Sequence, residues 1–153
     1  MTFANCSSLT DVSLPQNLES IKEMAFFNCS SLQAINLPGT LTSIEKSAFA
    51  NCSKLQKIDL PMSLTSLGMD AFNSCSSLTK IQIPPKISFI DMRTFLNCTS
   101  LESVVFPQCN VGISCESFIR CPNLKEIEFS MSSNDCLHFN AFEPQLQIKL
   151  RSQ

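Results

Sequence analysis

The nine cysteines are the residues of this 153-residue chain that could most readily do chemistry. Structural zinc sites usually take ligands from short C-x₂₋₄-C pairs, and the sequence contains no such pair. Six of the cysteines instead recur every 23 residues. Stacked repeats would bring these residues within disulfide range, but side chains in a ladder point parallel to each other. We therefore predict buried free thiols that pack as small apolar groups, with occasional disulfides or a metal as alternatives. The six residues are Cys6, Cys29, Cys52, Cys75, Cys98 and Cys121.

The remaining cysteines, Cys109, Cys115 and Cys136, do not follow this period. They lie near the less regular C-terminal part of the chain. A disulfide between Cys109 and Cys115, or between Cys115 and Cys136, is a hypothesis that counting alkylatable thiols with and without reduction would test.

Nothing else in the sequence suggests a catalytic centre. His138 is the only histidine, and a packed or surface position is more typical of such a residue than a role as a base. The acidic residues form no paired constellation, and three isolated glycines make no phosphate-binding loop. We therefore expect no enzyme activity, no cofactor and no metal.

Charge and hydropathy limit the classes of partner. The net charge of −2 gives no electrostatic reason to expect nucleic acid or an anionic membrane surface as a partner. No apolar run approaches the roughly 20 residues of a membrane span, so we expect no membrane insertion. The chain begins inside a repeat without a visible signal peptide. We therefore expect a fragment of a longer protein, or a variant without its first cap.

Asparagine precedes four of the periodic cysteines and creates N-glycosylation sequons at Asn5, Asn28, Asn51 and Asn97. In a protein secreted by a eukaryote, glycans could crowd this edge. The alternative, which we favour, is that asparagine suits a turn and that the sequons are a by-product of the repeat.

The periodic cysteines belong to a longer repeated pattern. Each has a phenylalanine three residues before it and a leucine three residues after it. A fixed period of this length is typical of leucine-rich solenoids. The phenylalanines are Phe3, Phe26, Phe49, Phe72, Phe95 and Phe118, and the leucines are Leu9, Leu32, Leu55, Leu78, Leu101 and Leu124.

The third copy illustrates the elements that we expect in one coil. Phe49 and Cys52 are three residues apart, which would place them on one face of a tight helical or 3₁₀ turn. Ile58 and Leu60 alternate as on an extended strand, and Pro61 ends that strand because it has no N–H to donate. One coil alone buries too little apolar surface to offset the entropy of ordering its residues, so the coils must stack.

We predict a single leucine-rich repeat domain of the α/β type over residues 1–153. It would be a right-handed solenoid of about six coils, with a parallel β-sheet on one face and short helical or 3₁₀ turns on the other. Regular repeats would cover 1–130. An atypical coil over 131–153 would form a C-terminal cap, since the spacing changes near Phe142. In the fifth copy Asn110 replaces an apolar residue, and Val111 is expected to fill its place.

The string Ala-Phe-x-x-Cys-x-x-Leu-x-x-Ile-x-Leu-Pro-x-x-Leu-x-x-Ile resembles the BspA-like leucine-rich repeat family. In the third copy it runs from Ala48-Phe49 through Leu60-Pro61 to Leu67. Thr94 and Ser117 depart from the alanine position. The resemblance implies a non-catalytic module for protein binding or adhesion, at the cell surface or outside the cell, whose ligand is a protein of a host or of another cell.

The exposed face of the predicted sheet is the candidate binding site, because leucine-rich repeats commonly bind proteins there. The face is polar, mixed in charge and has no aromatic anchor, so a solvated surface without a partner is the alternative. Two other functions remain open: a structural spacer that self-associates end to end through its first coil, and a cytosolic scaffold, since free thiols suit a reducing compartment. The candidate residues are Gln33, Asn36, Gln56, Lys57, Asp59, Thr79, Lys80, Gln82, Glu102 and Val105.

Overall fold

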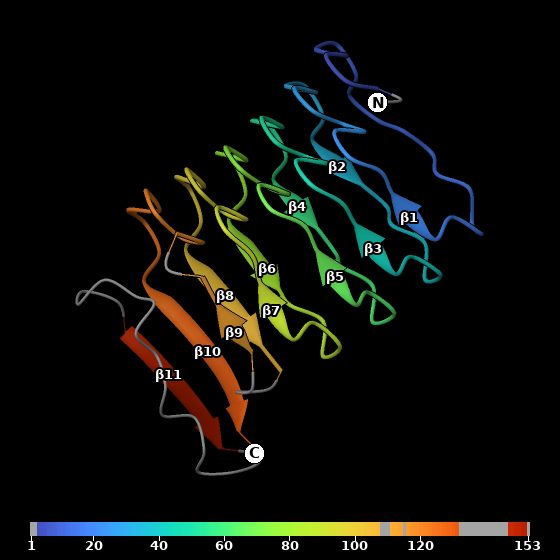
Figure 1. Cartoon of the computed structure of the whole chain (residues 1–153). Coiled ribbons are helices and arrows are strands. Elements are labelled where there is room, and N and C mark those ends of the chain that lie inside the picture. The colour runs from blue at the N-terminus through green and yellow to red at the C-terminus, as the bar shows by residue number, and fades with distance from the viewer. Residues whose placement is uncertain (1–2, 108–110, 115, 132–146, 153) are drawn as a thin grey trace.

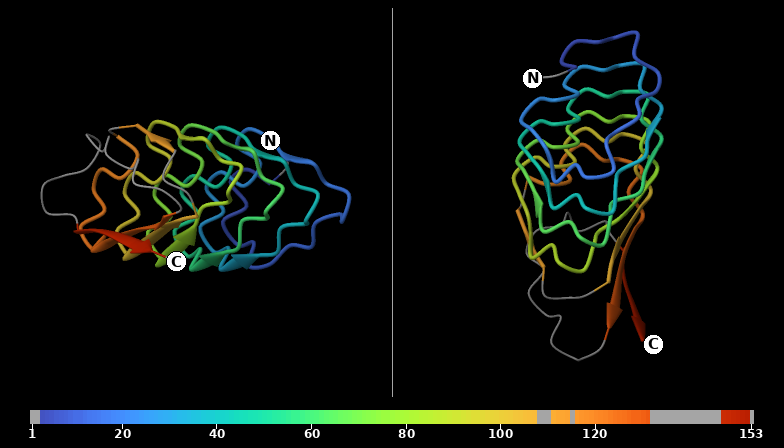
Figure 2. Two further views of the ribbon diagram at one scale, coloured as in Figure 1. Left: turned by 90° about the horizontal axis from the view of Figure 1, so that it is seen from below. Right: turned by 90° about the vertical axis from the view of Figure 1, so that its right-hand side faces the viewer.

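Each 23-residue repeat forms one coil, and the coils stack along a single axis into an elongated solenoid (Figures 1 and 2). The computed structural model describes residues 3–107, 111–114, 116–131 and 147–152. A complete coil carries two short strands that are joined by turns. The stacking predicted from the period is therefore confirmed.

The strands form two ladders that run along the solenoid axis (Figure 1). Every pairing is parallel, and partners in the regular coils are 23 residues apart, as in Ile35 with Ile58 and Ile44 with Leu67. The first ladder contains β2 (Ala34–Ile35), β4 (Lys57–Ile58), β6 (Lys80–Gln82), β8 (Ser103–Phe106), β10 (Glu126–Met131) and β11 (Gln147–Ser152). The second contains β1 (Ser20–Ile21), β3 (Ser43–Ile44), β5 (Ser66–Leu67), β7 (Phe89–Ile90) and β9 (Gly112–Ile113).

The first-ladder strands lengthen toward the C-terminus, from two residues in β4 to six in β10. The burial of the inward-facing residue near the end of the strand increases in the same direction. Leu37 and Leu60 are half-buried there, whereas Ile83, Phe106 and Phe129 are fully buried. A second apolar side chain in the core holds the backbone extended for longer, because it anchors the next inward-facing position of the strand.

The segments that lead from the second strand of one coil to the first strand of the next contain no helix among the described residues. The predicted helical or 3₁₀ turns are therefore not found. In residues 45–55 the N–H groups of Ser47, Phe49 and Asn51 donate to the next coil, at 2.8 to 2.9 Å. The N–H groups between them close single turns within the coil. Ser47 and Asn51 have φ of 54° and 63°, and left-handed residues at this interval prevent a continuous right-handed helix.

The phenylalanines form one stack through the core. Five successive ring pairs, from Phe3 to Phe118, have centroids 5.2–5.6 Å apart and planes within 10°. Val111 is buried in this core, as expected of a replacement for Asn110, which lies outside the described residues. Of the predicted cap, the structure describes mainly β11, which pairs with β10 in a shorter step, Ile127 with Ile148.

Candidate functional site

The thiols of five of the six periodic cysteines hydrogen-bond to the backbone of the coil before them. The Cys52 thiol donates to the Phe26 carbonyl oxygen, with Sγ and O 3.1 Å apart. That oxygen also accepts the N–H of Cys29, at 3.2 Å, so the thiol occupies the second lone pair of a buried carbonyl. The same contact recurs along the ladder at 3.1–3.2 Å, for Cys29, Cys75, Cys98 and Cys121.

All six periodic cysteines are free, as predicted. Burial raises the pKa of Cys52 to about 12 and that of Cys121 to about 11. Burial also raises the pKa of Cys29, Cys75 and Cys98. Because the thiolate is the reactive form, these side chains are chemically inert at neutral pH and act as packing groups. Cys109, Cys115 and Cys136, with the proposed disulfides, lie outside the described residues, as does His138.

The sequon asparagines occupy left-handed turn positions. Their φ values lie between 59° and 65° at Asn5, Asn28, Asn51 and Asn97. Asparagine is one of the few residues that adopts this conformation readily. The conformational reason predicted for asparagine is thus confirmed, while glycosylation stays a prediction.

The ten candidate binding residues lie on or beside β2, β4, β6 and β8, and point away from the core. Nine are exposed, and Val105 is half-buried. The parallel register places Lys80 beside Ser103, and Gln82 beside Val105. We call this surface the strand face. The structure brings the residues together on one side of the solenoid.

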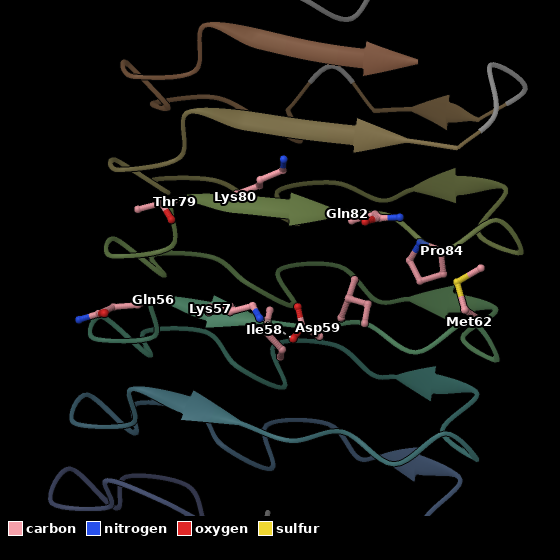
Figure 3. Close-up of a pocket in the computed structure, with 10 residues that line it drawn as sticks. Gln56, Lys57, Ile58, Asp59, Met62, Thr79, Lys80, Gln82 and Pro84 are labelled. Carbon is pink, nitrogen blue, oxygen red and sulfur yellow. Dashed lines mark ion pairs between the residues drawn. The ribbon is translucent and has the colours of Figure 1, made fainter. Parts of the chain in front are cut away.

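An open groove of about 510 Å³ crosses the strand face between β4 and β6. Figure 3 shows that it runs from Gln56 and Thr79 at one end to Met62 and Pro84 at the other. We call it the seam groove. Six of the candidate residues line it, together with apolar residues that sequence reasoning did not include. Its lining is Gln56, Lys57, Ile58, Asp59, Leu60, Met62, Thr79, Lys80, Gln82 and Pro84.

The seam groove lies where both strand ladders are interrupted. β4 does not pair with β6, and β5 does not pair with β7. In the coils on either side, the residue that precedes the first strand donates its N–H to the previous coil, as Gln56 does to Gln33 at 3.0 Å and Glu102 to Thr79 at 2.9 Å. The equivalent N–H of Thr79 has no hydrogen-bond partner within the described part of the chain. The Phe stack continues across this boundary, with Phe49 and Phe72 centroids 5.5 Å apart.

The charged side chains of the seam groove are Lys57, Asp59 and Lys80. Lys57 Nζ lies 2.8 Å from Asp59 Oδ2, and both side chains are exposed. No ion pair of Lys80 occurs among the described residues. Two lysines against one aspartate leave one excess positive charge, and the groove can therefore attract an anionic group.

The model of the BspA type leucine rich repeat region matches six copies over residues 1–125 of this sequence. The chain belongs to the BspA-type leucine-rich repeat family. The match covers most of the chain and agrees with the 23-residue step of the ladders. No curated protein sequence matches it.

Several solved structures resemble this BspA-type chain. A leucine rich cell surface protein from Faecalibacterium prausnitzii A2-165 is 33% identical with a TM-score of 0.75, over 80% of this chain and 32% of its own. The Treponema pallidum leucine rich repeat protein is 32% identical with a TM-score of 0.72, over 77% and 57%. A leucine-rich repeat protein from Bacteroides ovatus is 29% identical with a TM-score of 0.76, over 97% and 38%. The chain thus spans about a third to just over half of these proteins.

Two exposed apolar side chains of the BspA-type coils escaped sequence reasoning. Met62, which is 63% exposed, follows the proline that ends the first strand and lines the seam groove. Phe89, 52% exposed, lies on β7, where the other coils carry Ser20, Ser43 and Ser66. In the sequence, each residue differs in type from the residues at the equivalent position of the other repeats, and this difference could have indicated both positions. The candidate residues of the strand face include no aromatic side chain, whereas the second ladder carries the exposed ring of Phe89.

The described residues contain neither a cluster of metal ligands nor a membrane-spanning helix. No group of three or more His, Cys, Asp or Glu side chains there could hold a metal ion. The same residues form no helix suited to crossing a lipid bilayer.

Proposed function

We propose that this BspA-type segment is a non-catalytic protein-binding or adhesion module that binds its ligand through the strand face. The observation that carries the proposal is the seam groove, which cuts an otherwise regular ladder and gathers six of the candidate residues. Flat polar sheet surfaces offer little shape for a partner, whereas a concave patch with a few polar groups and an apolar wall is typical of binding sites.

Surface display as part of a longer protein belongs to the same proposal. A structure 33% identical to this chain is described as a leucine rich cell surface protein. The family match supports a protein-interaction role more generally. Labelling of intact cells with an impermeant reagent tests the location, and a protein that is labelled only after lysis would instead favour the cytosolic scaffold.

The test of binding is a pull-down from a cell-surface extract with the double variant Lys57→Glu, Lys80→Glu. We expect the variant to lose the retained protein. The matched control is Lys54→Glu, Lys86→Glu, which makes the same change in charge at exposed positions outside the groove. If both double variants lose the protein equally, or neither does, the strand face is not the binding surface.

A second candidate is a spacer that stacks end to end through its first coil. Phe3, Leu9 and Leu14 in that coil are only half-buried, whereas Phe26 and Leu32 in the next are fully buried. Another coil placed against them would complete their burial. Concentration-dependent light scattering should then show oligomers that Phe3→Glu abolishes, and a monomer at all concentrations would exclude this candidate.

A further inference from the structure

We propose that the seam groove binds an acidic side chain of an extended peptide, with the Thr79 N–H and the Lys57 and Lys80 ammonium groups as donors and Met62 as the apolar contact. The proposal rests on the proposed function of the strand face and names the chemistry of its partner.

The first argument is the missing rung of the ladder at Thr79. The corresponding N–H groups of Gln56, Glu102 and Lys125 donate to the previous coil at 2.9–3.1 Å, whereas that of Gln33, in the second coil, has no such bond within the described residues. The N–H of Thr79 has no such acceptor within the described residues, although Thr79 lines the groove. A backbone N–H that is dehydrated without an acceptor destabilises a complex. A partner that excludes water from the Thr79 N–H therefore binds more tightly if it brings an oxygen acceptor to it.

The second argument is charge. Lys80 follows Thr79 directly, and Lys57 reaches the groove from the neighbouring coil (Figure 3). A carboxylate offers two oxygens that can accept from an N–H and from ammonium groups together. Asp59 holds the Lys57 ammonium group at 2.8 Å but leaves Lys80 as the excess charge. Charge complementarity thus favours an acidic partner over a basic or neutral one.

The third argument is the apolar end of the groove. Met62 is 63% exposed there, next to the half-buried Leu60 and the buried Pro84. Methionine adapts its shape to different apolar side chains. Because Lys57 and Met62 are five residues apart, an extended chain covers the distance between them in roughly five residues. The preferred peptide therefore carries acidic residues followed, within about five residues, by apolar ones.

The test is an NMR titration of the ¹⁵N-labelled chain with a short acetylated and amidated peptide that has two glutamates followed by two leucines, spaced by threonines. We expect the amide signals of Thr79 and Lys80 to shift with peptide concentration. Lys80→Glu should weaken binding at least about tenfold, because it replaces attraction with repulsion. Lys86→Glu, outside the groove, should change the dissociation constant less than about twofold.

A second peptide with lysines in place of the glutamates separates charge recognition from general adsorption. Equal shifts with both peptides, no shift at Thr79, or unchanged affinity in Lys80→Glu would each overturn the proposal. The ¹⁵N spectrum of Lys80→Glu shows directly whether the variant is folded, and Lys80→Gln, which removes charge without reversing it, should show an intermediate loss.

The outcomes also separate this inference from the proposed function. If surface-extract binding is lost in Lys57→Glu, Lys80→Glu but the acidic peptide does not bind, the strand face binds a partner of other chemistry and only this inference fails. If the acidic peptide binds at Thr79 while surface-extract binding survives the double substitution, the proposed function fails.

Discussion

Raising the pH above 9 should destabilise this solenoid, because its buried thiols stay protonated in the folded chain while the same thiols ionise in the unfolded chain. The ordinary thiol pKa is 9.0, whereas burial raises the pKa of Cys52 to about 12. Burial also raises the pKa values of Cys75 and Cys98 well above 9.0. Below pH 9 the thiols are protonated in both states, so their contribution to stability is fully present. Above pH 9 the unfolded chain releases protons that the folded chain retains, so the free energy of unfolding falls as pH rises.

The magnitude follows from the number of buried thiols. At pH 10, one unit above the unfolded pKa, each thiol that stays protonated in the folded state lowers the free energy of unfolding by about 1–2 kcal/mol. Cys52, Cys75 and Cys98 together give about 4 kcal/mol. Cys29 and Cys121, whose pKa values are also raised, add to this. A loss of this size is a large part of the roughly 5–15 kcal/mol that stabilises a typical domain.

The assay is urea unfolding followed by far-UV circular dichroism at pH 8, 9 and 10 in the presence of a phosphine reductant. The chain has no tyrosine, so no phenol titrates in this range. Cys75→Ala removes one buried thiol and should reduce the fall in the free energy of unfolding from pH 8 to pH 10 by about 1–2 kcal/mol. This difference is independent of any change in stability that the substitution causes at pH 8. Cys6→Ala, at an exposed position, is the matched control and should leave the fall unchanged.

The reasoning would be refuted if stability changed by less than about 1 kcal/mol between pH 8 and pH 10. It would also be refuted if Cys75→Ala and Cys6→Ala gave the same pH dependence, because burial would then not be what keeps the ladder protonated.

Three further predictions concern single positions. The side chain of Asp70 is 12% exposed and accepts hydrogen bonds from Arg93 Nε at 3.1 Å and Nη2 at 3.0 Å; Asp70→Ala should therefore lower the free energy of unfolding by about 1–3 kcal/mol in urea titrations. A Cβ on Gly68 would lie 2.6 Å from a backbone nitrogen, whereas one on Gly39 meets nothing within 4 Å. Gly68→Ala should thus destabilise by more than about 1 kcal/mol and Gly39→Ala by less than about 0.5 kcal/mol, and similar melting temperatures would contradict this. In native-state alkylation followed by peptide mapping, Cys6 should react within minutes while the buried thiols of the ladder stay unmodified, and early modification of the buried thiols would show that the coils open readily.

The period in the sequence was sufficient to predict the register of the ladders. Identical residues at identical spacing can all be buried only if each meets its counterpart in the next coil, so Phe49 stacks on Phe26 and Phe72. The thiol state of Cys52 followed from the same argument. Its hydrogen bond to a carbonyl did not, because it depends on the exact approach of two backbones.

The predicted helical turn is not found among the described residues, and the reason is that a spacing of three residues fits two backbone conformations. Phe49 and Cys52 would face the same way on a 3₁₀ helix, and they also do so in a chain of single turns. The left-handed φ of Ser47 is compatible with a chain of single turns and not with a 3₁₀ helix. This φ could not be predicted, because serine is not a residue type that favours positive φ. The seam groove could not be predicted either, since the segment around Thr79 has the same residue pattern as its neighbours, and the break between β4 and β6 is a property of the backbone pairing.

The unbroken column of phenylalanine rings gives the molecule translational symmetry along its axis, in which each inner coil presents nearly the same upper and lower surface. Unequal recombination between such tandem copies can therefore add or remove whole units of 23 codons and still leave every ring opposite a like neighbour. A change of another length keeps the inward-facing side chains in register only where the turns absorb the difference, as in the shorter step from Ile127 to Ile148. Overall length, and with it the reach of the molecule, is free to vary in evolution in steps of one coil, while the interior keeps a fixed sequence.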